Sequence, residues 1–217
     1  MYFQSRSAAG QLIASKLQQY RFENCAVIAL GYSSVLVAEP IAAQLHALLG
    51  LFITEKIGVP GEGLTYGTVD QTGGFSYNRS MSEGERDDYY GEYHGFIEEQ
   101  KRESYAKINR LLASGGMIEP AVLREHVVIV VADGLKDGQK LDAVSEFLKP
   151  IKVKRLIIAT PIASVTAVDR MHIVADEIHC LAVTENYFNA SHYYDVNEKI
   201  THEQAVEKVK NIVLSWC

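Results

Sequence analysis

The sequence predicts an α/β fold: a doubly wound, mainly parallel sheet with helices on both faces. Short apolar, β-prone runs alternate with helical segments of about ten residues or more, which is typical of β-α-β units. The run of valine and isoleucine at residues 127–131 is typical of a parallel strand that is covered on both faces. The chain has 217 residues, 47% of them hydrophobic, which is enough to bury a full core without disulfides or structural metal ions.

The first half of the chain is expected to open with a strand-turn-helix unit and to continue with short strands. An apolar strand leads into a glycine-containing turn, and a segment with apolar residues at helical spacing follows. Turn-forming residues after position 58 then separate the shorter strands. The expected elements are the strand 25–30, the turn 31–34, the helix 35–49 and the strands 51–57, 64–69 and 74–77.

The second half is expected to repeat the strand-turn-helix pattern around a central strand. Pro150 is expected to end one helix and Pro161 one strand, because proline lacks the N–H that both structures use. The expected elements are the helix 96–112, the strand 127–131, the turn 132–138, the helix 139–149, the strand 155–160, the helix 164–173 and the strand 177–183.

The chain is expected to end in a docked helix. Thr201 and Gln204 have the T-x-x-Q spacing of a capping box, which marks a helix start. Four apolar side chains then fall on one face of the predicted helix. These are Val206, Val209, Val213 and Trp216.

One domain is expected over residues 6–217. Residues 1–5 resemble the tail of a cleavable expression tag and are set aside. Residues 62–113 are expected to form a mobile loop or hairpin and a long helix, since the segment from residue 82 is the most polar part of the chain. Residues 184–217 are expected to contribute to a small hood and to the terminal helix.

Charge and cysteine content argue against several classes of protein. The formal net charge of -6 gives no overall attraction for nucleic acid or for an anionic membrane, and we expect neither as a partner. No apolar run approaches the roughly 20 residues needed to cross a bilayer. The three cysteines are widely spaced, which argues against a disulfide framework and favours a cytoplasmic location.

Two turns are the predicted ligand sites. In an open doubly wound sheet, ligands bind beyond the carboxyl ends of the strands. The turns at residues 31–34 and 132–140 follow strands and precede helices, whose first N–H groups are suited to anions, so a phosphate is the expected ligand. The alternative is that Gly31, Gly134 and Gly138 only allow tight turns.

The stretch VVIVVADGLKDGQK at residues 127–140 resembles the phosphoribosyl pyrophosphate (PRPP) motif of type I phosphoribosyltransferases. Four further segments resemble a bacterial branch of the same family, so the resemblance covers nearly the whole chain after residue 5. It implies a parallel sheet with flanking helices, a small hood built from terminal segments, and a homodimer. The four segments are KIGVPG at residues 56–61, IEEQKRE at 97–103, ATPIAS at 159–164 and HYYDV at 192–196.

The sequence departs from the family pattern at three places. Ala132 stands where the family has the first of two acids that bind the ribose hydroxyls, and only Asp133 remains. Asp137 stands in the phosphate loop where the family has a threonine, and Lys136 and Lys140 offset part of its charge. At residues 31–34 the sequence Gly-Tyr-Ser-Ser replaces the arginine- and glycine-containing turn that holds pyrophosphate in the related branch.

The resemblance assigns a candidate site from the matching positions. Asp133 is the candidate catalytic residue, and Mg²⁺ is expected only together with PRPP, if the protein is active. The candidate substrate-binding residues are Tyr32, Ser33, Ser34, Lys56, Asp133, Gly134, Leu135, Lys136, Asp137, Gly138, Gln139 and Lys140.

Three functions are compatible with these residues. The favoured one is a phosphoribosyltransferase-like protein with impaired catalysis, acting as a regulatory subunit or binding a small phosphate compound or nucleotide. The second is an active PRPP-dependent transferase that acts on a nucleobase. The third is a serine hydrolase with Ser33 as nucleophile, Asp133, and His179 or His192, although Val35 replaces the glycine that closes a G-x-S-x-G turn.

Overall fold

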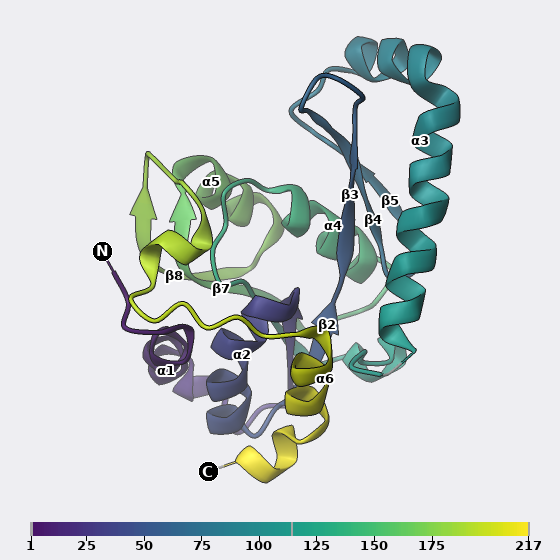
Figure 1. Ribbon diagram of the computed structural model, residues 1–217. Coiled ribbons are helices and arrows are strands. Elements are labelled where there is room, and N and C mark those ends of the chain that lie inside the picture. The colour runs from purple at the N-terminus through teal and green to yellow at the C-terminus, as the bar shows by residue number, and fades with distance from the viewer. Residues whose placement is uncertain (1, 114, 217) are drawn as a thin grey trace.

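The computed structural model describes residues 2–113 and 115–216, which form two sheets with helices around them (Figure 1). The larger sheet is parallel, with the strand order β2-β1-β6-β7-β8, and the smaller one is antiparallel, with the order β3-β4-β5. The predicted fold class is therefore confirmed. The strands are β1 (Cys25–Leu30), β2 (Leu48–Phe52), β3 (Thr54–Gly58), β4 (Thr65–Asp70), β5 (Phe75–Tyr77), β6 (Val127–Val131), β7 (Arg155–Ser164) and β8 (Glu177–Thr184).

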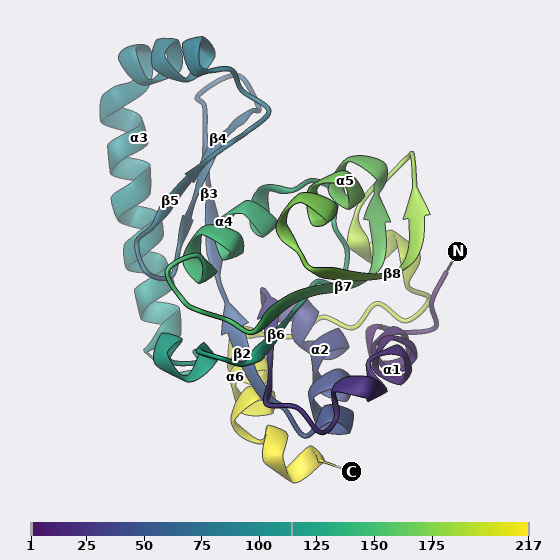
Figure 2. The ribbon, with the colours of Figure 1, turned by 180° about the vertical axis from the view of Figure 1, so that it is seen from behind.

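Helices cover both faces of the large sheet (Figures 1 and 2). One core joins one face of the sheet to α1, α2 and α6, and a second core joins the other face to α4 and α5. β6 lies in the middle of the sheet with all five residues buried, as its continuous apolar sequence predicts. The α-helices are α1 (Arg6–Lys16), α2 (Tyr32–Leu45), α3 (Glu83–Leu112), α4 (Gln139–Leu148), α5 (Val165–Val174) and α6 (His202–Lys210); the short 3-10 helices are η1 (Gln18–Tyr20), η2 (Pro120–Leu123), η3 (Ala190–Tyr193) and η4 (Ile212–Ser215).

The small sheet and α3 form an arm beside the large sheet (Figures 1 and 2). The expected single strand 51–57 is wrong: Ile53 separates β2, in the large sheet, from β3, in the small one. α3 begins at a capping box of Ser82 and Glu85 and is kinked at Tyr93. The polar segment from residue 82 is therefore helical from Glu83 onward.

Four predicted boundaries are also wrong, one of them being the end of the predicted helix 35–49, since α2 ends at Leu45 and β2 begins at Leu48. α2 begins at Tyr32 rather than at residue 35, so the turn after β1 is a single glycine, Gly31. β7 continues through Pro161 because β6 ends at Val131, opposite Ala159, and the missing N–H of the proline is not needed beyond that point. The terminal helix begins at the predicted capping box but ends at Lys210. Of the four predicted apolar side chains, Val206 and Val209 are buried, whereas Val213 and Trp216 are exposed.

The opening residues, which the sequence argument set aside, take part in the fold. Phe3 is 4% exposed, packs with Tyr193 and Tyr194, and forms a backbone bridge to Tyr194. The side chain of Ser5 accepts a hydrogen bond from the Ala8 N–H and so caps α1. The sequence analysis did not predict α1, which buries Ile13 and Ala14 against the rest of the core.

Close packing of α1 on α2 depends on Gly10. A Cβ atom at this position would lie 2.3 Å from the Val37 carbonyl oxygen and 2.6 Å from the Pro40 side chain. We expect Gly10→Ala to lower the free energy of unfolding by about 1–3 kcal/mol, because the two helices must move apart. Urea denaturation checks this, with Gly84→Ala as the control, since a Cβ at Gly84 meets nothing within 4 Å. A loss no larger than that of the control would contradict the packing argument.

Among the residues that the structure describes, no helix combines the length and the apolar composition needed to cross a membrane.

Candidate functional site

The two predicted turns lie side by side at one edge of the sheet. β1 and β6 are adjacent and parallel, so their carboxyl ends bring Gly31 and Asp133 to the same place. A cleft of about 250 Å³ opens there, between the start of α2, the start of α4 and the segment that joins β2 to β3. Four of the predicted residues line it: Tyr32, Ser33, Asp133 and Lys140.

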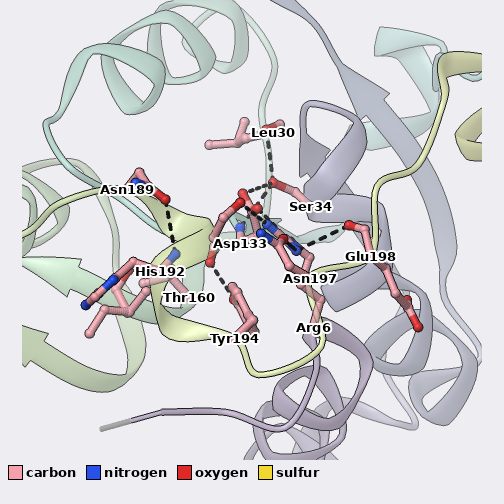
Figure 3. A network of polar contacts seen from close by, with 12 residues as sticks. Arg6, Leu30, Ser34, Asp133, Thr160, Asn189, His192, Tyr194, Asn197 and Glu198 are labelled. Atoms are coloured by element: carbon pink, nitrogen blue, oxygen red, sulfur yellow. Dashed lines mark hydrogen bonds and ion pairs between the residues drawn. The ribbon is translucent and has the colours of Figure 1, made fainter.

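The carboxylate of Asp133 is held by Arg6, 127 positions away in the sequence (Figure 3). The Arg6 Nε atom lies 2.9 Å from Oδ2 of Asp133, and the two side chains are only 3% and 12% exposed. The guanidinium also donates to Oδ1 of Asn197 at 2.8 Å and lies 4.6 Å above the Tyr194 ring. Arg6 thus connects the start of the chain and the segment after η3 to Asp133, the first acid of the predicted motif.

Asp133 is fixed from its other side by Ser34 and Tyr194. Its backbone N–H donates to Oγ of Ser34 at 3.1 Å, and Oδ1 lies 3.3 Å from the same hydroxyl. The Tyr194 hydroxyl donates to the Asp133 carbonyl oxygen at 2.5 Å (Figure 3). Burial, together with the nearby Asp133 charge, raises the pKa of Tyr194, so this phenol stays protonated and remains a donor. Ser34 is 1% exposed and therefore serves Asp133 rather than a ligand.

In the predicted turn at residues 132–140, Gly134 is covered by the segment that follows β8, and Leu135 packs against β7. A Cβ atom at Gly134 would lie 2.3 Å from the Tyr187 hydroxyl and 3.0 Å from the Ala190 side chain. Leu135 is 2% exposed, and its N–H donates to the Ile162 carbonyl at 3.0 Å. These two predicted site residues are thus packed against protein, and the glycine is needed for close approach.

Charged groups occupy the start of α4. The Asp137 side chain accepts a hydrogen bond from the Gln139 N–H at 3.1 Å, so a carboxylate already lies at the helix N-terminus. Lys56 Nζ lies 3.8 Å from Oδ2 of Asp137, and the side chains of Lys56 and Asp137 are 51% and 41% exposed. The Ser164 hydroxyl donates a hydrogen bond to the backbone carbonyl oxygen of Lys136 at 2.6 Å. A Cβ at Gly138 would meet the Arg170 side chain at 2.4 Å.

Ala132 lies in the core of the protein and does not line the cleft. Its side chain is 2% exposed and belongs to the core that α4 and α5 cover. The resemblance assigns two positions, 132 and 133, to the ribose hydroxyls. The first has no acid, and the acid at the second, Asp133, already forms an ion pair with Arg6.

The residues proposed for a serine hydrolase are not brought together. His179 is 2.6 Å from Glu177 on β8, which β6 and β7 separate from β1. His192 contacts Tyr2 and lies near Asn189. The Asp133 carboxylate contacts Arg6 and Ser34 instead of a histidine. The structure therefore gives no support to Ser33 as a nucleophile.

Sequence reasoning missed the residues that come from distant segments. Arg6, Tyr187 and Asn197 meet at the end of β6, and Thr54 and Glu55 line the cleft. Nothing local marks them, because each lies more than 50 positions from Asp133. The HYYDV segment was the one available signal, since it contains Tyr194.

Comparisons with known proteins agree on the fold. No protein-family model matches the chain. Two curated proteins of Mycobacterium tuberculosis, from strains CDC 1551 / Oshkosh and ATCC 25618 / H37Rv, each named "Putative phosphoribosyl transferase", are 26% identical over 197 residues. The match covers 88% of this chain and 43% of each relative, so the chain spans less than half of their length. The crystal structure of TT1426 from Thermus thermophilus superposes with a TM-score of 0.73 at 24% identity, over 100% of this chain and 99% of that one.

Proposed function

We propose that this chain is a phosphoribosyltransferase-like protein whose cleft does not turn over PRPP, and which binds another small phosphate compound or nucleotide or acts as a regulatory subunit. Three observations support the assignment to this group: the resemblance of residues 127–140, the names of the two mycobacterial relatives, and the parallel sheet with its small second sheet.

The observation that carries the loss of catalysis is the buried ion pair of Arg6 and Asp133. The resemblance implies two acids that bind the ribose hydroxyls. Here one position is the buried Ala132, and the other carboxylate has Oδ2 on Arg6 and Oδ1 beside Ser34. To bind a ribose, Asp133 would have to leave a buried, charge-assisted contact, which is strong and directional.

The phosphate side of the cleft opposes PRPP as well. Asp137 places its carboxylate at the N–H groups that the resemblance assigns to the 5′-phosphate. Two unit charges of the same sign about 4 Å apart repel by about 4 kcal/mol at an effective dielectric constant of 20. Lys56, at 3.8 Å from Asp137, neutralises part of this charge, and Lys140 lines the same cleft. The Lys56 ammonium group is exposed, so water and salt screen its contribution.

Magnesium would enter bound to PRPP. Within residues 2–113 and 115–216, no three metal-binding side chains come together. The acids that line the cleft are Asp133 and Glu55, and Glu55 already pairs with Lys107 at 2.8 Å.

Thermal unfolding with and without PRPP and magnesium tests the proposal. We expect no shift in Tm for the unmodified protein at millimolar PRPP, and no release of pyrophosphate when nucleobases are added. A ligand present at 100 times its dissociation constant stabilises the native state by about 2.7 kcal/mol, which raises Tm by several degrees or slightly less in a chain of this size. Asp137→Thr removes the repulsive carboxylate and should give a measurable shift.

The matched control is Asp88→Thr, which removes one negative charge from an exposed position on α3. A shift in Asp137→Thr and none in Asp88→Thr would locate the PRPP phosphate at the start of α4. A clear shift and pyrophosphate release in the unmodified protein would overturn the proposal and establish the active transferase.

A further inference from the structure

β8 is an open edge of the large sheet. It is eight residues long and pairs with β7 on one side, and on its other side no strand or helix of the described chain lies beside it (Figures 1 and 2). The opposite edge strand, β2, is covered by another part of the chain. There the Leu51 N–H donates to the Gly116 carbonyl at 2.7 Å, and Ile118 packs against Gly50. A loop therefore covers β2 and leaves β8 uncovered.

The sequence of β8 has none of the usual protections of an exposed edge. Natural edge strands carry lysine, proline, a bulge or an inward-pointing charge, or they are very short. β8 reads Glu-Ile-His-Cys-Leu-Ala-Val-Thr, with its one acid at the first position and no proline, and its pairing with β7 continues to Thr184. Val183 is 53% exposed, and the segments that lead into and out of the strand expose Ile173 and Phe188 by 72% and 67%. Such an edge is a template for another strand.

We propose that this edge pairs with the same strand of a second copy of the chain. Closed dimers have a two-fold axis, which places identical strands antiparallel, so the two sheets would join into one continuous sheet. A second copy fits because the middle of β8, residues 178–182, is uncharged at neutral pH apart from any protonation of His179, and because its single acid, Glu177, can be placed away from the acids of the symmetry mate.

The flanking charges select one register. Like charges directly opposite each other destabilise a strand pair. A two-fold axis that makes the two copies of β8 antiparallel keeps each residue on the same sheet face in both copies, so one residue must lie opposite itself. If Leu181 faced the partner's Leu181, Glu177 would face the partner's Glu185. If Cys180 faces the partner's Cys180, no like charges lie opposite each other. Of the registers without a clash, this one retains the longest overlap.

In this register Val183 lies opposite the partner's Glu177, which gives a test by the sign of one charge. Val183→Glu would place two carboxylates face to face at both symmetry-related sites, whereas Val183→Lys would place an ammonium group opposite each carboxylate. Val183 is exposed in the single chain, so both variants should fold alike, which circular dichroism checks. The two variants are matched controls for each other.

Sedimentation equilibrium under reducing conditions measures the result. We expect the unmodified chain and Val183→Lys to have twice the mass of the 24.1 kDa chain, and Val183→Glu to dissociate with a dimer Kd about tenfold higher or more. A monomer in the unmodified protein, or the same Kd for both variants, would overturn the proposal.

Cross-linking tests the register separately. A short bis-maleimide should join Cys180 to the partner's Cys180, identified as a peptide pair by mass spectrometry, and Cys180→Ser should lose that product. Burial raises the pKa of both Cys180 and Cys25, that of Cys25 to about 11, so the sequence of the linked peptides, rather than the rate of reaction, distinguishes the Cys180 product from one that contains Cys25 or Cys217. A stable dimer without the Cys180 cross-link would overturn the assignment of β8 to the interface.

Discussion

Replacing Arg6 by methionine is expected to lower the free energy of unfolding by about 3–5 kcal/mol, because it leaves the buried Asp133 carboxylate without its cation. Arg6 is 3% exposed and donates to Asp133, Asn197 and Ser191, so the substitution breaks a network rather than a single contact. Urea denaturation measures the loss. The double variant Arg6→Met/Asp133→Asn should recover part of it, since the unpaired charge is then absent.

The matched control is Arg102→Met. Arg102 also has a guanidinium nitrogen 2.9 Å from a carboxylate, that of Glu99, but these side chains are 73% and 58% exposed. Its loss should cost at most about 1 kcal/mol, because water solvates both groups and screens the pair. Equal losses for Arg6→Met and Arg102→Met would show that burial of the Arg6 ion pair does not matter, and the central argument about Asp133 would fail.

Phe3→Ala is expected to lower the free energy of unfolding by about 3–5 kcal/mol, the usual range for removing a buried phenylalanine side chain. Phe3 is 4% exposed and packs with Ala9, Ile162 and the two tyrosines of the HYYDV segment. The same urea experiment measures it. The result decides whether the opening residues belong to the folded core, which their likeness to a tag tail argued against.

Phe22→Ala provides the control for Phe3→Ala, because Phe22 is 95% exposed. A change within about 0.5 kcal/mol is expected there, as for most surface substitutions. If Phe3→Ala changed the free energy of unfolding as little as Phe22→Ala, packing of the N-terminal segment would not stabilise the fold. The position of Arg6 would then have to be fixed by other contacts.

Local sequence patterns correctly predicted those helices and strands whose formation depends on residues that are close together in the sequence. The continuous apolar run 127–131 specified a central strand, and Thr201 with Gln204 specified a helix start, because burial on both faces and capping depend on neighbouring residues. The same reasoning misplaced the end of β7 and joined β2 to β3. Whether a proline is tolerated, or a strand changes sheet, depends on which strand lies beside it.

By itself, the sequence determined the fold class, and it predicted that the turns after the first and the central strand lie together, where the structure has a cleft. Only the tertiary structure decided the state of Asp133. Its cation comes from Arg6 and its cover from Tyr194, and these residues meet because α1 and the segment after β8 cross the same end of the sheet. Such contacts join residues 61 and 127 positions apart, so no local spacing encodes them.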